Sequence, residues 1–219
     1  MKNSTIRPSV AIGLCILFGG AYVFIVLAII SGMTWGFDKS VIDAIQGLEA
    51  PWLTSIMIAF TFIGSTKVVM LLTIAMTILL VWKFRARSQA YFFFFVMVGT
   101  IIAFQTLKVI YKRDRPEFHR LAEAGGYSFP SGHAMMATSL YALLTYMLWR
   151  HIQSTAGRIA LLSFAIFMFG MISLSRIYLG VHYPSDILGG LFASAFWVAL
   201  TTFLFVQFQK RKERSLVQD

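Results

Sequence analysis

The chain has 219 residues, of which 58% are hydrophobic and 13% are charged, and its mean hydropathy is +0.75. A water-soluble domain of this size needs a more polar surface, so the composition excludes one and indicates an integral membrane protein. The net charge of +10 requires no nucleic-acid partner, because most of the excess lies on the predicted cytoplasmic side, including a basic segment at 210–214 that suits anionic lipid headgroups. Cys15, the single cysteine, allows no intramolecular disulfide.

The apolar stretches predict an all-α polytopic membrane protein with six transmembrane helices, separated by glycine, proline or clustered charge. The predicted spans are 9–33, 66–83, 89–111, 132–150, 157–178 and 185–208. The first is a retained span and not a signal peptide, because it is longer than a signal h-region and has no small-residue cleavage site. We treat 1–219 as a single membrane-embedded domain with both termini on one side.

The region between the first two spans predicts additional short helices. The apolar stretch 52–82 is too long for one helix across a hydrocarbon core of about 30 Å, and Gly64-Ser65 is the natural break. We therefore expect 52–63 to form a short re-entrant or interfacial helix. Before it, residues 41–49 have an apolar helical face, which predicts a helix resting on the extracytoplasmic membrane surface.

The distribution of Lys and Arg predicts the orientation in the membrane. In the six-span arrangement, eleven of the 19 Lys and Arg residues lie on the side of the two termini and eight lie on the other side. The positive-inside rule therefore places both termini in the cytoplasm. The loops that follow the third and fifth spans then face the extracytoplasmic side.

Three clusters of polar residues lie at the extracytoplasmic ends of the predicted spans. They are Lys108 with Arg115-Pro116, then Pro130-Ser131-Gly132-His133, then Ser175-Arg176 with His182 and Asp186. Each cluster alone has an ordinary structural explanation, such as a serine helix cap, a snorkelling cation or an aspartate cap. Together they indicate a functional site, because cations and the first-turn amides of a helix suit a phosphoryl group.

The spacing of His182 and Asp186 predicts a reactive imidazole. Pro184 suits the first position of a helix, which places Asp186 in the first turn, from where its carboxylate reaches back to His182. A carboxylate on one ring nitrogen fixes the tautomer and leaves the other nitrogen as a nucleophile. His133, at the start of another predicted span, is placed to give a proton to a leaving alkoxide.

These clusters resemble the three motifs of the type 2 phosphatidic acid phosphatase superfamily, and no motif position is missing. The resemblance covers the motif core 108–186, and the six-helix layout extends it to nearly the whole chain. It implies that His182 attacks phosphorus to form a phosphohistidine, that Asp186 orients His182, and that His133 protonates the leaving group. It also implies phosphate binding by Lys108, Arg115, Ser131, Gly132 and Arg176. No metal or other cofactor is expected, because the cations and amides already neutralise the phosphate.

Among membrane members of this superfamily, the chain resembles the bacterial phosphatidylglycerophosphatase B type. The resemblance implies an enzyme of the bacterial cell membrane that hydrolyses the terminal phosphomonoester of phosphatidylglycerophosphate at the extracytoplasmic face. The alternatives are an undecaprenyl pyrophosphate phosphatase that recycles the cell-wall carrier lipid, and a non-catalytic lipid-phosphate transporter. Ionisable groups gathered at one face argue against transport. The expected partners are the bilayer and a phospholipid or polyprenyl phosphate substrate, with no nucleic acid and no obligate protein partner.

Overall fold

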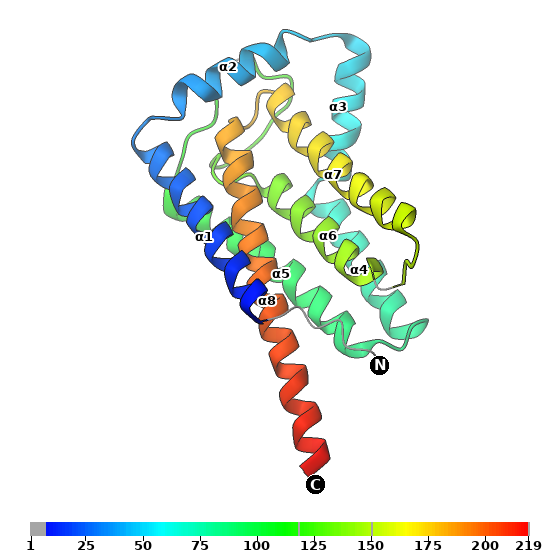
Figure 1. Cartoon of the computed structure of the whole chain (residues 1–219). Helices are drawn as coiled ribbons and strands as arrows, with labels where there is room; N and C mark the ends of the chain where they lie inside the picture. Colours follow the sequence, from blue (N-terminus) through cyan, green and yellow to red (C-terminus); the bar gives the residue numbers. More distant parts are fainter. Residues whose placement is uncertain (1–7, 118, 150, 219) are drawn as a thin grey trace.

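The structure is a computed structural model that describes residues 8–117, 119–149 and 151–218, and over those residues it is helical with no strand. Its helices are α1 (Pro8–Ile30), α2 (Trp35–Gln46), α3 (Pro51–Ile63), α4 (Thr66–Trp82), α5 (Arg87–Tyr111), α6 (Gly132–Trp149), α7 (Thr155–Tyr178) and α8 (Pro184–Gln218). The longer helices run alongside one another, α2 lies across one end of them, and the C-terminal part of α8 projects beyond the other end (Figure 1). Residue 150, the predicted end of the fourth span, lies outside the described residues.

Helix α6 is the centre of the bundle, where it packs against α4, α5, α7 and α8. Most of its residues are buried, including Met135, Met136 and Leu143, which belong to the main hydrophobic core. Because α6 is enclosed by other helices, it can carry polar residues that lipid would not tolerate. One of them, Ser139, accepts a hydrogen bond of 2.9 Å from the hydroxyl of Thr100 on α5.

Four described helices are long and apolar enough to cross a membrane: α1, α5, α7 and α8 up to Arg211. The bent pair α3–α4 passes the same criterion when it is taken as one span, which makes five. Helix α6 is not among them, because a helix enclosed by protein does not need the hydropathy of one that faces lipid. The predicted total of six spans, and the cytoplasmic placement of both termini, stay predictions.

The predicted break at Gly64-Ser65 is confirmed. Helix α3 ends at Ile63 and α4 begins at Thr66, with an angle of 48° between them. Ser65 caps α4 by accepting a hydrogen bond of 3.4 Å from the backbone N–H of Val68. A Cβ atom at Gly64 would lie 2.4 Å from Cγ2 of Ile172, so the absence of a side chain allows α7 to pack closely against the bend.

The helix predicted at residues 41–49 is present as α2, but its bounds and its packing face differ from the prediction. Helix α2 ends at Gln46, so Leu48 lies beyond it and is exposed. The buried residues of α2 are Asp38 and Ile42, and the helix contacts α7 and α8. The apolar pattern did not identify this face because one of its two buried residues is an acid whose partners lie elsewhere in the chain.

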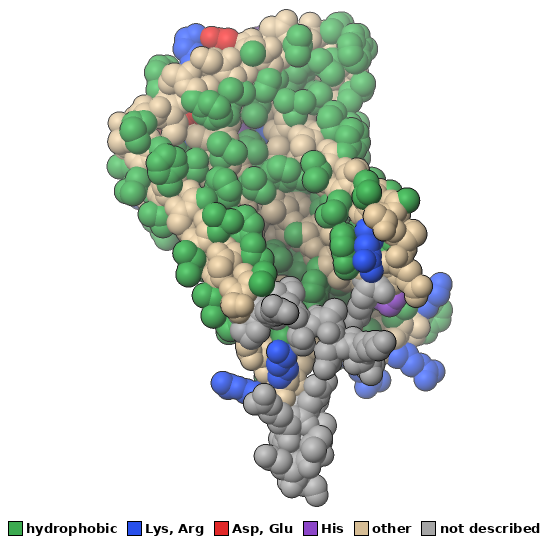
Figure 2. All heavy atoms as spheres, viewed as in Figure 1, with side chains coloured by type: hydrophobic (Ala, Val, Ile, Leu, Met, Phe, Trp, Pro, Cys, Tyr) green, Lys and Arg blue, Asp and Glu red, His purple; other side chains and the backbone are tan. Residues whose placement is uncertain are grey.

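The outer surface of the bundle is apolar. Ile16, Phe24 and Ile166 each expose more than 60% of their surface. Hydrophobic side chains cover the visible face along the helices, whereas charged side chains gather near its two ends (Figure 2). This distribution suits a multi-pass membrane protein, because lipid tails meet the apolar band and the polar ends meet the interfaces.

The contact between α5 and α8 yields a test of the fold. A Cβ atom at Gly99 would lie 2.3 Å from Cζ2 of Trp197, so Gly99→Ala is expected to destabilise the protein by about 1–3 kcal/mol. Gly170→Ala on α7 is the matched control, because a Cβ atom there would meet no other atom within 4 Å. Unfolding of both variants in detergent measures the difference, and equal stabilities would contradict the packing of α5 on α8.

Candidate active site

The three polar clusters meet at the end of the bundle near α2. The guanidinium Nη1 of Arg115 lies 3.3 Å from Nε2 of His182, and Nδ1 of His182 lies 3.3 Å from Oδ2 of Asp186. His182 is only 2% exposed and Asp186 is fully buried. Residues from the loop after α5 and from the start of α8 therefore form one site, as the sequence predicts.

The start of α8 fixes the geometry of the His182–Asp186 pair. Helix α8 begins at Pro184 and carries Asp186 in its first turn. The Oδ2 atom of Asp186 accepts a hydrogen bond of 2.9 Å from the backbone N–H of Tyr183, and this bond turns the carboxylate back toward His182. An aspartate in the first turn is also stabilised by the helix dipole.

His182 is neutral in this environment. Burial, helped by the charges of Arg176 and Arg115, lowers the pKa of His182 to about 3, although Asp186 acts in the opposite direction. Because an ionised carboxylate can only accept, the proton of the neutral ring is on Nδ1, from which it is donated to Asp186. Nε2 therefore carries a lone pair, and this lone pair faces the guanidinium of Arg115.

Arg176 offers an unsatisfied donor beside the histidines. It lies in the last turn of α7, is 6% exposed, and donates from Nη1 to the hydroxyl of Thr61 on α3. Its buried Nε has no hydrogen-bond partner among the described residues. Because a buried unpaired guanidinium N–H is costly, the site is suited to an anion that would accept from it.

Arg115 also organises the loop that surrounds the site. Its guanidinium donates to the backbone carbonyls of Gly125 and Gly126, both at 2.9 Å, and to that of Val181 at 2.6 Å. Lys108 acts on the same loop, because its Nζ donates to the carbonyl of Tyr127 at 2.6 Å. Both cations therefore shape the loop as well as contributing positive charge.

The N-terminus of α6 supplies the second cluster. The hydroxyl of Ser131 accepts from the N–H of Ala134 at 3.4 Å, and the N–H of Ser131 donates to the carbonyl of Asp186 at 3.2 Å. Ser131 is therefore a helix cap in this structure, and the amides of Gly132 and His133 follow it in a first turn that offers them no acceptor within the helix. The imidazole of His133 lies within electrostatic reach of Arg176, His182 and Lys108.

Four residues that contact the site were not identified from the sequence. Ser128 is fully buried and donates to Oδ2 of Asp186, and its hydroxyl lies 3.4 Å from Nδ1 of His182. The hydroxyl of Thr61 accepts a hydrogen bond from Arg176. Arg113 donates to Asp186 and also to Asp38. Arg113 stands in a visible run of charges at 112–115, but nothing in the sequence marks Thr61 or Asp38.

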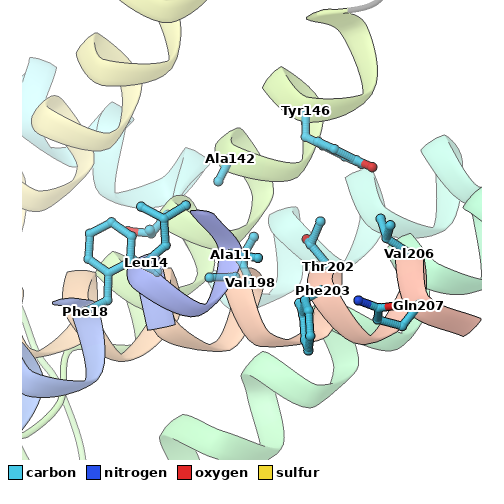
Figure 3. Close-up of a pocket in the computed structure, with 13 residues that line it drawn as sticks. Ala11, Leu14, Phe18, Ala142, Tyr146, Val198, Thr202, Phe203, Val206 and Gln207 are labelled. Atoms are coloured by element: carbon cyan, nitrogen blue, oxygen red, sulfur yellow. The ribbon is translucent and has the colours of Figure 1, made fainter. Parts of the chain in front are cut away.

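A separate cavity of about 270 Å³ lies between α1, α6 and α8. The side chains around it come from these helices and include Phe18, Ala142 and Phe203 (Figure 3). None of the described residues that line it is charged, and their polar side chains are two threonines, a tyrosine and a glutamine. It therefore offers nothing to balance a phosphate charge, and the candidate active site is the cationic cluster.

The sequence matches a model of a known protein family. The model of the PAP2 superfamily matches residues 89–211, more than half of the chain. The chain belongs to the PAP2 superfamily. The matched region contains all three polar clusters, so the resemblance seen in their spacing is confirmed.

Several curated PAP2 relatives are lipid phosphatases by name. The chain is 28% identical to "Phosphatidylglycerophosphatase B" of Bacillus subtilis over 77% of its length and 83% of the relative. It is 31% identical to "Lipid A 1-phosphatase" of Rhizobium johnstonii over 54% of this chain and 48% of the relative. It is 29% identical to "Putative undecaprenyl-diphosphatase YbjG" of Escherichia coli over 66% and 70% of the two chains.

Two solved structures share the PAP2 fold seen here. A transmembrane PAP2-type phosphatidylglycerolphosphate phosphatase from Bacillus subtilis matches with a TM-score of 0.81 at 23% identity, over 90% of this chain and 96% of the other. LpxE of Aquifex aeolicus matches with a TM-score of 0.60 at 20% identity, over 75% and 93% of the two chains. The predicted helical membrane fold is therefore confirmed.

The neutral state of His182 predicts a pH dependence of stability. Because its pKa is lowered to about 3 in the folded protein, only the unfolded chain binds a proton at this position just below pH 6.5. Acid therefore destabilises the fold, and the contribution of this residue rises toward ~1.4 kcal/mol per pH unit as the pH falls from 6.5 to 5. We expect His182→Gln to remove that part of the slope. Chemical unfolding of both proteins across this range measures it, and equal slopes would show that His182 is not buried as a neutral ring.

Proposed function

We propose that this protein is a membrane lipid phosphatase that removes the terminal phosphate of phosphatidylglycerophosphate and produces phosphatidylglycerol. Membership of the PAP2 superfamily and the named activities of the relatives support a phosphoric monoester hydrolase that acts on a lipid. The observation that carries the proposal is the buried imidazole of His182, held by Asp186 and facing Arg115. A nucleophile between a carboxylate and a guanidinium is the arrangement that attack on a phosphate ester needs.

In the proposed first step, Nε2 of His182 attacks phosphorus in line with the ester oxygen. The N–P bond forms, the P–O bond to the glycerol breaks, and His133 gives its proton to the departing alkoxide. Asp186 stabilises the positive charge that develops on the His182 ring. In the second step, water attacks phosphorus while His133 takes a proton from it, the N–P bond breaks, and inorganic phosphate leaves with His182 restored.

The phosphate oxygens are proposed to be held by Lys108, Arg115 and Arg176 together with the amides at the start of α6. The unpartnered Nε of Arg176 supports this role, because a phosphate oxygen would satisfy it. Ser131 and Gly132 are proposed to bind the phosphate as well, since Ser131 caps α6 and Gly132 is the first residue of that helix. Three cations and two amides balance the developing charge on the phosphate, so we expect turnover without a divalent metal ion.

The lipid substrate is inferred from two matches. Phosphatidylglycerophosphate is favoured by the match to phosphatidylglycerophosphatase B of Bacillus subtilis, which extends over 77% of this chain, and by the structural match with a TM-score of 0.81. Undecaprenyl diphosphate is the second candidate, which the Escherichia coli relative supports. Transport without hydrolysis is disfavoured, because the ionisable groups of the three polar clusters lie together at one end of the bundle and the nucleophile is already paired with its carboxylate.

Purified protein assayed on phosphatidylglycerophosphate, undecaprenyl diphosphate and phosphatidic acid tests the proposal. We expect the highest kcat/KM on phosphatidylglycerophosphate, and we expect activity to persist in excess EDTA. His182→Gln is expected to lower kcat by at least about 10³-fold, because it removes the attacking nitrogen. His151→Gln is the control, since His151 is exposed in the turn that follows α6.

Normal turnover by folded His182→Gln would remove the proposed nucleophile. A strict requirement for a divalent ion would contradict the proposed charge balance by Lys108, Arg115 and Arg176. A higher kcat/KM on undecaprenyl diphosphate would replace the first substrate with the second and leave the chemistry intact.

We further propose that the site faces the extracytoplasmic side of a bacterial cell membrane and that both termini are cytoplasmic, as the charge distribution suggests. Gly125 is exposed beside the site and has open space around its Cβ position. In a Cys15→Ala background, Gly125→Cys is expected to react with a membrane-impermeant maleimide on spheroplasts. His151→Cys, at the other end of the bundle, is expected to react only after permeabilisation. The reverse labelling pattern would invert the topology.

A further inference from the structure

Asp38 is a buried acid that lies outside the region matched by the PAP2 family model. It is fully buried in the first turn of α2. Its Oδ1 accepts from the backbone N–H of Ser185 at 2.8 Å, and its Oδ2 accepts from the hydroxyl of Ser185 at 2.6 Å. The same Oδ2 accepts from Nη2 of Arg113 at 3.0 Å. Asp38 therefore holds the first turn of α8, which carries Asp186.

Arg113 connects Asp38 to the candidate active site. Its Nη1 donates to Oδ1 of Asp186 at 2.7 Å, while its Nη2 donates to Asp38. Its guanidinium also lies over the ring of Tyr183, 4.2 Å from the ring centre. A planar guanidinium can bind two carboxylates at once through separate nitrogens in a fixed geometry, whereas a lysine ammonium has no such rigid fork.

The two oxygens of Asp186 have different partners. Oδ1 faces Arg113, whereas Oδ2 faces His182, Ser128 and the N–H of Tyr183. Arg113 thus binds the carboxylate oxygen of Asp186 that faces away from His182 and so helps to orient the carboxylate. Asp38 in turn holds Arg113 in place. The connected groups run in the order Asp38, Arg113, Asp186, His182, and only the last of them faces the proposed phosphate site.

We propose that Asp38 is a positioning residue for the His182–Asp186 pair and acts through Arg113. Two buried carboxylates share one guanidinium, so neither receives its full positive charge. Without the charge of Asp38, Arg113 interacts with Asp186 alone and weakens the ability of Asp186 to stabilise a positive His182 ring. This inference rests on the proposed function, in which that positive charge develops during attack.

A purely structural role for Asp38 predicts something different. A residue that only holds α2 against α8 would, when changed, reduce the fraction of folded protein and leave the kinetics of the folded remainder unchanged. A positioning residue lowers kcat of correctly folded protein, with little effect on KM, because it acts on charge that develops in the transition state. Measurement of kcat and KM on folded protein therefore separates the two roles.

The experiment uses the full chain in detergent with phosphatidylglycerophosphate as substrate. Asp38→Asn keeps the shape of the side chain and the carbonyl that accepts from the N–H of Ser185. It removes the charge and replaces the oxygen that accepts from Arg113 and from the hydroxyl of Ser185 with an NH₂ donor. We expect kcat per folded molecule to fall at least about 10-fold and KM to change less than about twofold. Asp43→Asn is the matched control on the same helix, because Asp43 is exposed and pairs only locally with Lys39 at 2.6 Å.

A double-mutant cycle tests whether the effect passes through Arg113. If it does, Asp38→Asn combined with Arg113→Gln is no slower than Arg113→Gln alone, because the path is already broken. Additive losses would overturn the inference. Should Asp38→Asn fail to fold, Arg113→Lys is the deciding variant, because it keeps the charge but lacks the rigid fork whose two nitrogens donate separately to Asp186 and Asp38. A selective fall in its kcat supports the inference, and an unchanged kcat overturns it.

Two outcomes separate this inference from the proposed function. If wild-type protein hydrolyses phosphatidylglycerophosphate, His182→Gln abolishes the reaction, and Asp38→Asn matches Asp43→Asn, then only the inference is overturned. If wild-type protein hydrolyses none of the three lipids, or His182→Gln remains active, the proposed function is wrong and the positioning role is overturned with it.

Discussion

The candidate active site depends on the hydrogen bond between a buried neutral imidazole and a buried carboxylate. His182 and Asp186 are both almost completely removed from solvent, and each alone would be costly to bury. Asp186 is tolerated because Arg113, Ser128 and the N–H of Tyr183 contact it together with His182. His182 is tolerated because burial keeps it uncharged. The surrounding helices are arranged so that these partners arrive from three separate segments of the chain.

The membrane fold accommodates this polar site by separating two kinds of surface. The outward faces of α1 and α7 are apolar and exposed, as at Ile16 and Ile166. Buried polar side chains lie instead on α6, as at Ser139, and at the end of the bundle near α2, as at His182 and Asp186. Helix α2 is therefore part of the support of the site and not only a surface helix. Its Asp38 binds the start of α8 and also binds Arg113, which in turn donates to Asp186.

Much of this arrangement could be predicted from the sequence, because it depends on local patterns. Apolar length identified the helices, Gly64-Ser65 marked the bend, and the spacing of His182, Pro184 and Asp186 fixed the imidazole–carboxylate pair within one helix start. Asp38 and Thr61 could not be predicted, because their partners are 147 and 115 residues away. Such contacts depend on how the helices pack, which no local spacing encodes. The phosphate contact expected for Ser131 stays a prediction, and the contact that its hydroxyl makes in the structure is the cap of α6.

The most direct test of the proposed chemistry is to trap the covalent intermediate. Purified protein is mixed with phosphatidylglycerophosphate labelled in its terminal phosphate and quenched in base within one turnover, because phosphohistidine is hydrolysed in acid. Peptide mapping then locates the label. We expect labelled phosphate on His182 and on no other residue. Turnover at a normal rate with no labelled protein, or with the label on a different residue, would contradict nucleophilic attack by His182.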